Sequence, residues 1–277
     1  KRFEEYAARL LKKELDKQYT TARNAWESGR LRYVPLDEDD PNFIEKYEVL
    51  LEERENHRAY IREFENLVKT LQDAHKNGTF LPLPFSRCRF EIYDLSYGLY
   101  RPFLKIAEGL EIVVKPLPLN DSESDFVKRL DEYHGNNPEL TSVYEMYLIR
   151  NKTRSGIGFF ENSGFYPDFI LWLIDKTASV QHIVFIEPHG LGHERFRSDK
   201  MALHHRIKEF EAKLSGTVQG ISITLDSFIV SPTAYKALGD NRLVREPGWF
   251  SNKSCKMLRI LLFFIGCCSE TEVSEQL

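Results

Sequence analysis

Residues 164–190 read GFYPDFILWLIDKTASVQHIVFIEPHG. The pattern of apolar and polar residues in this segment predicts that it forms the central part of the fold. Two apolar runs flank a short polar segment, 175–179, that has the composition of a turn. Apolar runs of this length between turn residues indicate buried strands, so the segment predicts a β-hairpin. One carboxylate, Asp168 or Glu187, stands at the outer end of each run.

The position of the turn predicts the register of the hairpin. If the chain folds about Thr177 and Ala178, facing residues have numbers that add to 355, and Asp168 faces Glu187. Cross-strand partners point to one face of the sheet with Cβ atoms about 4.5–5.5 Å apart. His189 shares that face with Glu187, because side chains alternate along a strand. Three polar groups are therefore expected to converge at one end of the hairpin.

Two carboxylates placed this close repel one another unless one is protonated or a cation lies between them. A hard divalent ion such as Mg²⁺ would relieve the repulsion, because proteins hold Mg²⁺ with one or two carboxylates and several waters. The pair would then form a Lewis-acid site. The alternative is an ordinary charged strand end, and a register shifted by one residue would place the two acids on opposite faces.

The segments around the hairpin predict an α+β domain over residues 119–235. Asn120 and Glu123 have the spacing of a capping box at the start of a helix that ends near Gly135. A strand is predicted over 143–151, a helix over 198–216 and a last strand over 221–231. With the hairpin included, the expected order is helix, three strands, helix, strand.

The flanking regions have a different composition. Residues 2–28 and about 43–75 are dense in charge, with apolar residues at helical spacing in the second stretch, so 1–78 is predicted to form an antiparallel helical hairpin. Residues 79–118 are aromatic and β-branched and predict short strands that connect the arm to the core. Residues 236–277 are expected to form a C-terminal extension, and their longest apolar run is too short to span a bilayer.

Composition limits the classes of function. The formal net charge of −4 argues against a wholly basic nucleic-acid binder, so any DNA contact has to come from a local patch. The four cysteines show neither zinc spacing nor a disulfide framework, which suits the cytoplasm. The chain starts at Lys1 without an initiator Met or a signal-peptide pattern, and we expect it to be part of a longer protein.

The motif residues resemble a known superfamily. A Pro-Asp pair, an apolar hairpin and a strand that ends in Glu-Pro-His resemble the PD-(D/E)xK nuclease signature. LNDSESDFVKRL (119–130), YLIRNKTRSGIGFFENSGFYPDFILWL (147–173) and FIEPHGL (185–191) are similar to the C-terminal nuclease region of DEAD/DEAH-box helicases related to type III restriction enzymes. The resemblance covers about 119–235 and implies a restriction-endonuclease-like core, a mixed sheet flanked by helices, that hydrolyses DNA with Mg²⁺ or Mn²⁺.

The resemblance also implies roles for single residues. Asp168 and Glu187 would be the metal-binding acids, with Pro188 offering its backbone carbonyl to the ion. Glu123 would be the acid from the first core helix, and its alternative role is that of a capping-box residue. Arg150 and Asn151 match an Arg-Asn pair in these relatives, where DNA contact and scaffolding of the site are both open.

The sequence departs from the family pattern at His189, where the family has lysine. That lysine orients the attacking water and offsets phosphate charge in the transition state. Histidine can act as an acid, a base or a metal ligand, but its charge near neutral pH is not guaranteed. Either His189 serves the reaction, or a neighbouring cation such as Lys208 has replaced the lysine, or the activity has been lost.

Partners follow from the same patterns. A basic stretch after the hairpin suits contacts with DNA phosphates, although a solvated helix face is the alternative; its candidates are Arg195, Arg197, Lys200 and Lys208. No G-x-x-x-x-G-K-[ST] loop is present, so the chain is not expected to hydrolyse ATP by that route. The resemblance implies an ATPase motor upstream of Lys1 or on a partner chain. We therefore expect the nuclease part of a restriction or phage-defence helicase-nuclease. The alternatives are an inactive DNA-binding or assembly module of the same fold and a structural adaptor.

Overall fold

The structure is a computed structural model, and it describes most of the chain. The described residues are 2–28, 33, 36, 40, 42–43, 46–51, 57–87, 89–99, 102–107, 112–152, 166–188, 199–214, 217–218, 220–231 and 249–251.

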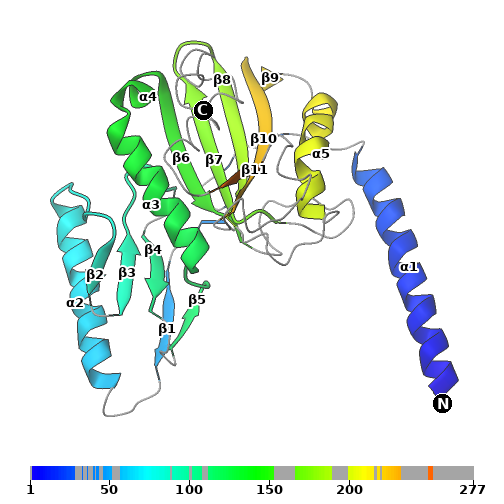
Figure 1. Cartoon of the computed structure of the whole chain (residues 1–277), viewed down its shortest axis with the longest axis horizontal. Coiled ribbons are helices and arrows are strands. Elements are labelled where there is room, and N and C mark those ends of the chain that lie inside the picture. The colour runs from blue at the N-terminus through cyan, green and yellow to red at the C-terminus, as the bar shows by residue number, and fades with distance from the viewer. Residues whose placement is uncertain are drawn as a thin grey trace.

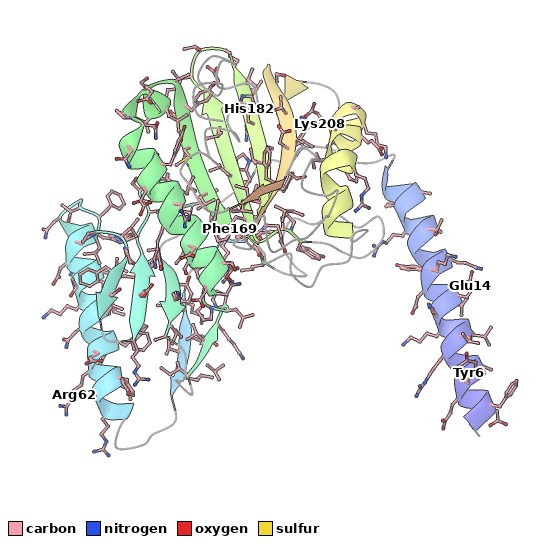
Figure 2. All side chains as sticks on the ribbon, viewed as in Figure 1. Tyr6, Glu14, Arg62, Phe169, His182 and Lys208 are labelled. Atoms are coloured by element: carbon pink, nitrogen blue, oxygen red, sulfur yellow. The ribbon has the colours of Figure 1, made fainter. Side chains whose placement is uncertain are left out.

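The N-terminal region is not the predicted helical hairpin. Helix α1 (Arg2–Ser28) is followed by strand β1 (Glu48–Leu51) and then by helix α2 (His57–Lys76), and the two helices lie at opposite ends of the molecule (Figure 1). The prediction of a helix across residues 47–51 is wrong because Tyr47 and Val49 alternate with the exposed Leu50, and β1 pairs with a strand far along the chain. Helix α1 projects from the body of the molecule, and its large apolar side chains, Tyr6 among them, are exposed (Figure 2).

The predicted strands between residues 79 and 118 are confirmed. Strands β2 (Phe85–Arg87), β3 (Phe90–Tyr93) and β4 (Phe103–Ile106) form an antiparallel sheet, and β5 (Ile112–Lys115) pairs with β1. Helix α2 covers these strands through a small apolar core that consists of Leu67, Phe90, Ile92, Leu104 and Val114.

The main sheet contains the elements predicted from residue 119 onward, and it confirms the α+β class. Helix α3 (Asp121–Asn136) and the short helix α4 (Pro138–Val143) precede the antiparallel strands β6 (Tyr144–Arg150), β7 (Phe169–Asp175) and β8 (Val180–Glu187). Helix α5 (Asp199–Lys213) and the short strand β9 (Thr217–Val218) lead to β10 (Ile221–Ser231), which runs parallel to β8. The predicted order of elements is confirmed, and α4 and β9 are additions to it.

The C-terminal extension contributes to the same sheet. Strand β11 (Trp249–Ser251) pairs in parallel with β10, so the strand order is β11-β10-β8-β7-β6. The apolar run 257–268 lies outside the described residues. In the part of the chain that the structure describes, no helix has the length and apolarity needed to cross a membrane.

The core of the main sheet joins its strands to helix α3 (Figure 1) and, through Ile207 and Phe210, to helix α5. The rings of Phe126 on α3 and Phe169 on β7 are 5.1 Å apart, and Phe103 of the small sheet approaches the same Phe169 at 6.1 Å. Burial of each such side chain contributes about 1.5–3 kcal/mol. Phe169 therefore joins the small sheet, α3 and the hairpin, and it directly follows the candidate acid Asp168.

A buried polar pair connects β8 with β10. His182 is 8% exposed, and its Nδ1 lies 2.7 Å from the hydroxyl oxygen of Thr224, the residue that faces it on β10 (Figure 2). Burial lowers the pKa of His182, and the charge of Lys208 acts in the same direction, while Asp175 and Glu211 oppose the shift. The folded protein therefore favours the neutral imidazole at this position.

We predict that His182 makes the protein less stable at mildly acidic pH. Because its pKa is lower in the folded state, the stabilisation from neutral His182 is complete above the unfolded pKa of about 6.5 and is lost as the pH falls toward the folded pKa. The free energy of unfolding of the wild type, measured by urea denaturation between pH 8 and 5, should fall more steeply than that of His182→Asn. Parallel curves for the two proteins would contradict this assignment.

Candidate metal-binding site at the end of the hairpin

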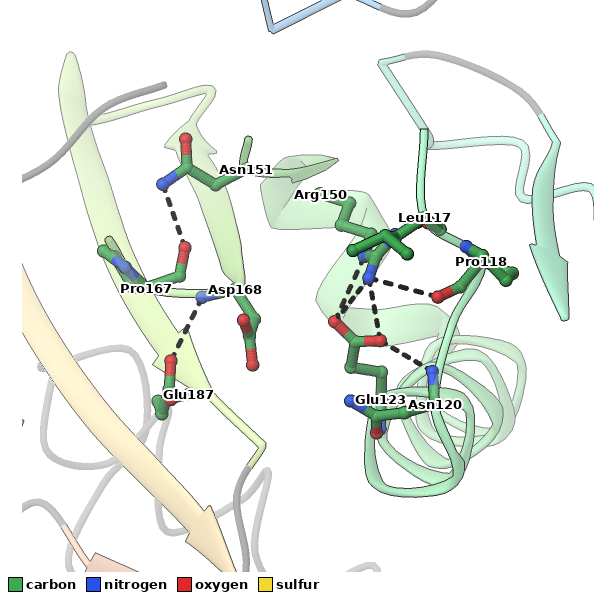
Figure 3. Close-up of polar contacts among 9 residues, drawn as sticks. All are labelled: Leu117, Pro118, Asn120, Glu123, Arg150, Asn151, Pro167, Asp168 and Glu187. Atoms are coloured by element: carbon green, nitrogen blue, oxygen red, sulfur yellow. Dashed lines mark hydrogen bonds and ion pairs between the residues drawn. The ribbon is translucent and has the colours of Figure 1, made fainter. Parts of the chain in front are cut away.

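The register of the hairpin is the one that the sequence predicted. Phe169 faces Ile186 and Asp175 faces Val180, so the next pair outward is Asp168 and Glu187. The backbone N–H of Asp168 donates a hydrogen bond of 3.3 Å to Oε2 of Glu187 (Figure 3). The predicted approach of the two acids at one end of the hairpin is confirmed.

The two acids differ in their exposure to solvent. Glu187 is only 5% exposed and Pro188 is buried, whereas Asp168 is partly buried. An ionised carboxylate has about four acceptor sites, so a carboxylate that accepts a backbone N–H can also bind a cation. Two carboxylates and one carbonyl are a donor set that fits Mg²⁺, which takes one or two protein carboxylates and keeps several waters. The described residues contain no group of three or more His, Cys, Asp or Glu side chains that could hold a metal ion.

Glu123 forms the predicted capping box. Its backbone N–H donates to Oδ1 of Asn120 at 3.0 Å, and its Oε2 accepts the backbone N–H of Asn120 at 2.7 Å. The same carboxylate accepts two contacts from Nη2 of Arg150, at 2.9 and 3.0 Å, and one from Nε at 3.1 Å. The capping role of Glu123 is thus confirmed, and its role as a metal acid remains a prediction.

Arg150 joins the end of β6 to the start of α3. Beyond Glu123, its guanidinium donates to the backbone carbonyls of Leu117 and Pro118, the residues that lead into the helix (Figure 3). The side chains of Arg150 and Glu123 are 17% and 3% exposed, so the pair is largely removed from water. A bidentate pair in such surroundings is strong and directional. These contacts support the scaffolding role of Arg150, and its contact with DNA remains a prediction.

Two features of this region were not predicted from the sequence, namely the pairing of Arg150 with Glu123 and the contact of Asn42 with Lys152. Asn42 is 2% exposed, and its Oδ1 accepts the backbone N–H of Lys152, two residues after the end of β6. The side chain of Asp40 holds the backbone of Asn42 in a local turn through a bond of 2.8 Å. The D-x-N spacing is a turn signal, but nothing in the sequence says which distant strand the turn contacts.

Lys208, the predicted replacement for the family lysine, lies away from the two acids. Its Nζ contacts Asp226 at 2.9 Å and Glu211 at 3.1 Å. Asp226 faces Val184 on β8, so it lies on the sheet face opposite to Glu187. Figure 2 shows Lys208 near His182, while Phe169, next to Asp168, lies at the other end of the sheet.

The charge of Lys208 is held by its two partners. Burial opposes the charged form, but the hydrogen bonds and negative charges of Asp226 and Glu211 outweigh it and raise the pKa of Lys208. Glu211 also accepts the backbone N–H of Leu225 on β10 at 2.6 Å, so the cluster attaches α5 to that strand. Its contacts are those of a structural residue, and a contact between Lys208 and DNA remains a prediction.

Other predicted site residues fall outside the described part of the chain. His189, Arg195 and Arg197 are not among the described residues, and Lys200 is described only as part of the backbone of α5. The roles assigned to these four residues therefore remain predictions.

No protein-family model, curated protein or solved structure matches the chain. The case for a function therefore depends on the residues of the site and on their geometry.

Proposed function

We propose that the chain is a divalent-metal-dependent DNA endonuclease whose catalytic core spans residues 119–235. The observation that carries the proposal is the approach of Asp168 and Glu187, with the amide of one residue 3.3 Å from the carboxylate of the other. The fold supports it through the order of α3, β6–β8, α5 and β10 in a mixed sheet, which is the order expected of a restriction-endonuclease-like core.

In this proposal Asp168, Glu187 and the carbonyl of Pro188 hold Mg²⁺ or Mn²⁺, which when bound supplies Lewis-acid activation at the scissile phosphate. Glu187 is oriented by the amide of Asp168, and its burial strengthens its electrostatic attraction to a cation. Glu123 fixes the start of α3 through its bonds to Asn120 and Arg150. His189, two residues beyond Glu187, is the group proposed to move or hold a proton.

The proposed substrate is a DNA phosphodiester, with an upstream or partner motor domain that delivers the DNA in a restriction or phage-defence system. Arg195, Arg197 and Lys200 are the proposed phosphate contacts. Lys208 is a weaker candidate for such a contact, because Asp226 and Glu211 already compensate its charge.

The second candidate is a module that keeps the fold and binds DNA or assembles with a partner without cleaving. Two observations favour it. The lysine of the nuclease motif is replaced by His189, and Lys208, the candidate replacement on α5, is paired with Asp226 on the other face of the sheet. Metal titration and cleavage assays separate the two candidates.

We predict that Asp168→Asn and Glu187→Gln each reduce Mg²⁺-dependent cleavage of plasmid DNA by about two to three orders of magnitude or more. Each substitution removes a charge that would hold the ion. The melting temperature should stay equal or rise, because the repulsion between the two carboxylates is relieved. Glu145→Gln on the exposed part of β6 is the matched control and should cleave like the wild type. Full activity in Asp168→Asn would exclude this site.

We predict that His189→Ala lowers turnover by about two to four orders of magnitude, the usual scale for a positioned proton-transfer or electrostatic group. His189→Lys should retain or raise activity and should flatten the pH dependence between about 5.5 and 7.5, where a histidine titrates. The measurement is the rate of plasmid nicking across that pH range. A wild type that is inert with every metal, together with an active His189→Lys, would support the inactive module instead.

A further inference from the structure

Arg150 is the last residue of β6 and Asn151 is the next, and their side chains lie on opposite sides of the sheet. Arg150 faces Phe169 in the ladder, and its side chain reaches the start of α3 on one side. Asn151 is the next residue, so its side chain points to the other face, the face that Asp168 and Glu187 share. Asn151 is 7% exposed, which is rare for an uncharged polar side chain unless it has partners.

The partners of Asn151 include the two residues of the Pro-Asp motif. The backbone N–H of Asn151 donates to the carbonyl of Asp168 at 2.8 Å and extends the β6–β7 ladder by one pair beyond Phe169. The side-chain Nδ2 donates to the carbonyl of Pro167 at 2.9 Å (Figure 3). Pro167 has no N–H of its own and cannot donate to a neighbouring strand. Asn151 therefore holds both consecutive carbonyls of the segment that carries the acid.

Loss of the hydrogen bond from Asn151 Nδ2 to the carbonyl of Pro167 would affect the position of Asp168. Pro167 is buried, and a buried carbonyl without a hydrogen-bond partner is unfavourable, so the segment would shift to find another donor. The backbone N–H of Asp168 is the group that contacts Glu187. This N–H and the carbonyl of Pro167 belong to the same planar peptide group. A rotation of that peptide would move the Asp168 amide away from Glu187.

The backbone after Asn151 is held as well. The N–H of Lys152 donates to Oδ1 of the buried Asn42 at 3.2 Å, so residues 151 and 152 are fixed on both sides. A rigid support of this kind is what the groups behind metal ligands provide in proteins.

We propose that Asn151 is the positioning residue of the acid pair, and that it acts through the backbone of Pro167 and Asp168 and makes no contact with DNA. The inference rests on the proposed function, because it concerns the affinity of Asp168 and Glu187 for a divalent ion. It chooses between the two roles that the sequence left open for Asn151.

The experiment measures Mn²⁺ binding by isothermal titration calorimetry without DNA and, separately, binding to a DNA duplex in chelator. Asn151→Ala should weaken Mn²⁺ binding by about 10–100-fold, the usual effect of removing a group that supports metal ligands. Its DNA affinity and salt dependence should equal those of the wild type. Asn137→Ala is the matched control, because Nδ2 of Asn137 also donates to a backbone carbonyl, that of Tyr133 at 2.7 Å, at the end of α3. This control should leave Mn²⁺ binding unchanged.

A second variant guards against a folding defect in Asn151→Ala. Asn151→Asp keeps the size of the side chain and removes the donor, while its added negative charge alone would tighten Mn²⁺ binding. Weaker binding in Asn151→Asp, with circular dichroism like that of the wild type, would thus support the positioning role.

The possible failures are distinguishable. Wild-type Mn²⁺ affinity in both Asn151 variants would overturn the inference and leave the proposed function intact. Weaker DNA binding of Asn151→Ala in chelator, with unchanged Mn²⁺ affinity, would make Asn151 a DNA contact and would also overturn it. A wild type that binds no Mn²⁺ would overturn the proposed function, and the inference with it.

Discussion

The register of the β7–β8 hairpin is the constraint on which the rest of the structure depends, and the chemistry of its turn specifies it. The side chain of Asp175 accepts the backbone N–H groups of Thr177 and Ala178 and the hydroxyl of Thr177, at 2.7–2.8 Å. These bonds lower the pKa of Asp175, with that from Ala178 contributing most. Ser179 then closes the turn in the left-handed region with φ of 55°. A slip by one residue would break these bonds and turn the buried face of both strands to the wrong side.

The position of both acids follows from this register. In an antiparallel pair the start of one strand lies beside the end of the other, so Asp168 before β7 meets Glu187 at the end of β8. Strand β10 runs parallel to β8, and a parallel neighbour requires a crossover connection, which here contains α5. The cluster of Lys208, Glu211 and Asp226 attaches that helix to β10 on the face away from the acids. The acid pair and this cluster therefore lie on opposite faces of the sheet.

The sequence predicted those features that depend on interactions between residues close together in the chain. The hairpin register, the capping box at Asn120 and Glu123, and the order of elements from α3 to β10 follow from turn chemistry and apolar periodicity in contiguous residues. Strand β1 was missed because four residues in a charged region carry too little pattern, and its partner β5 lies more than sixty residues away. The bonds between Arg150 and Glu123 and between Asn42 and Lys152 join distant segments, and no spacing in the sequence encodes them. A polar residue at the end of a strand can bind DNA, a metal or its own backbone, and only the fold distinguishes these roles.

The ion pair of Arg150 with Glu123 also affects which carboxylate charges are already compensated in the folded protein. A buried carboxylate needs compensation, and the bidentate guanidinium provides it for Glu123 in the absence of any ion. Asp168 and Glu187 together carry two negative charges, which match the charge of one divalent cation. Arg150 thus compensates the charge of Glu123 on one face of the sheet, while Asp168 and Glu187 approach one another on the other face.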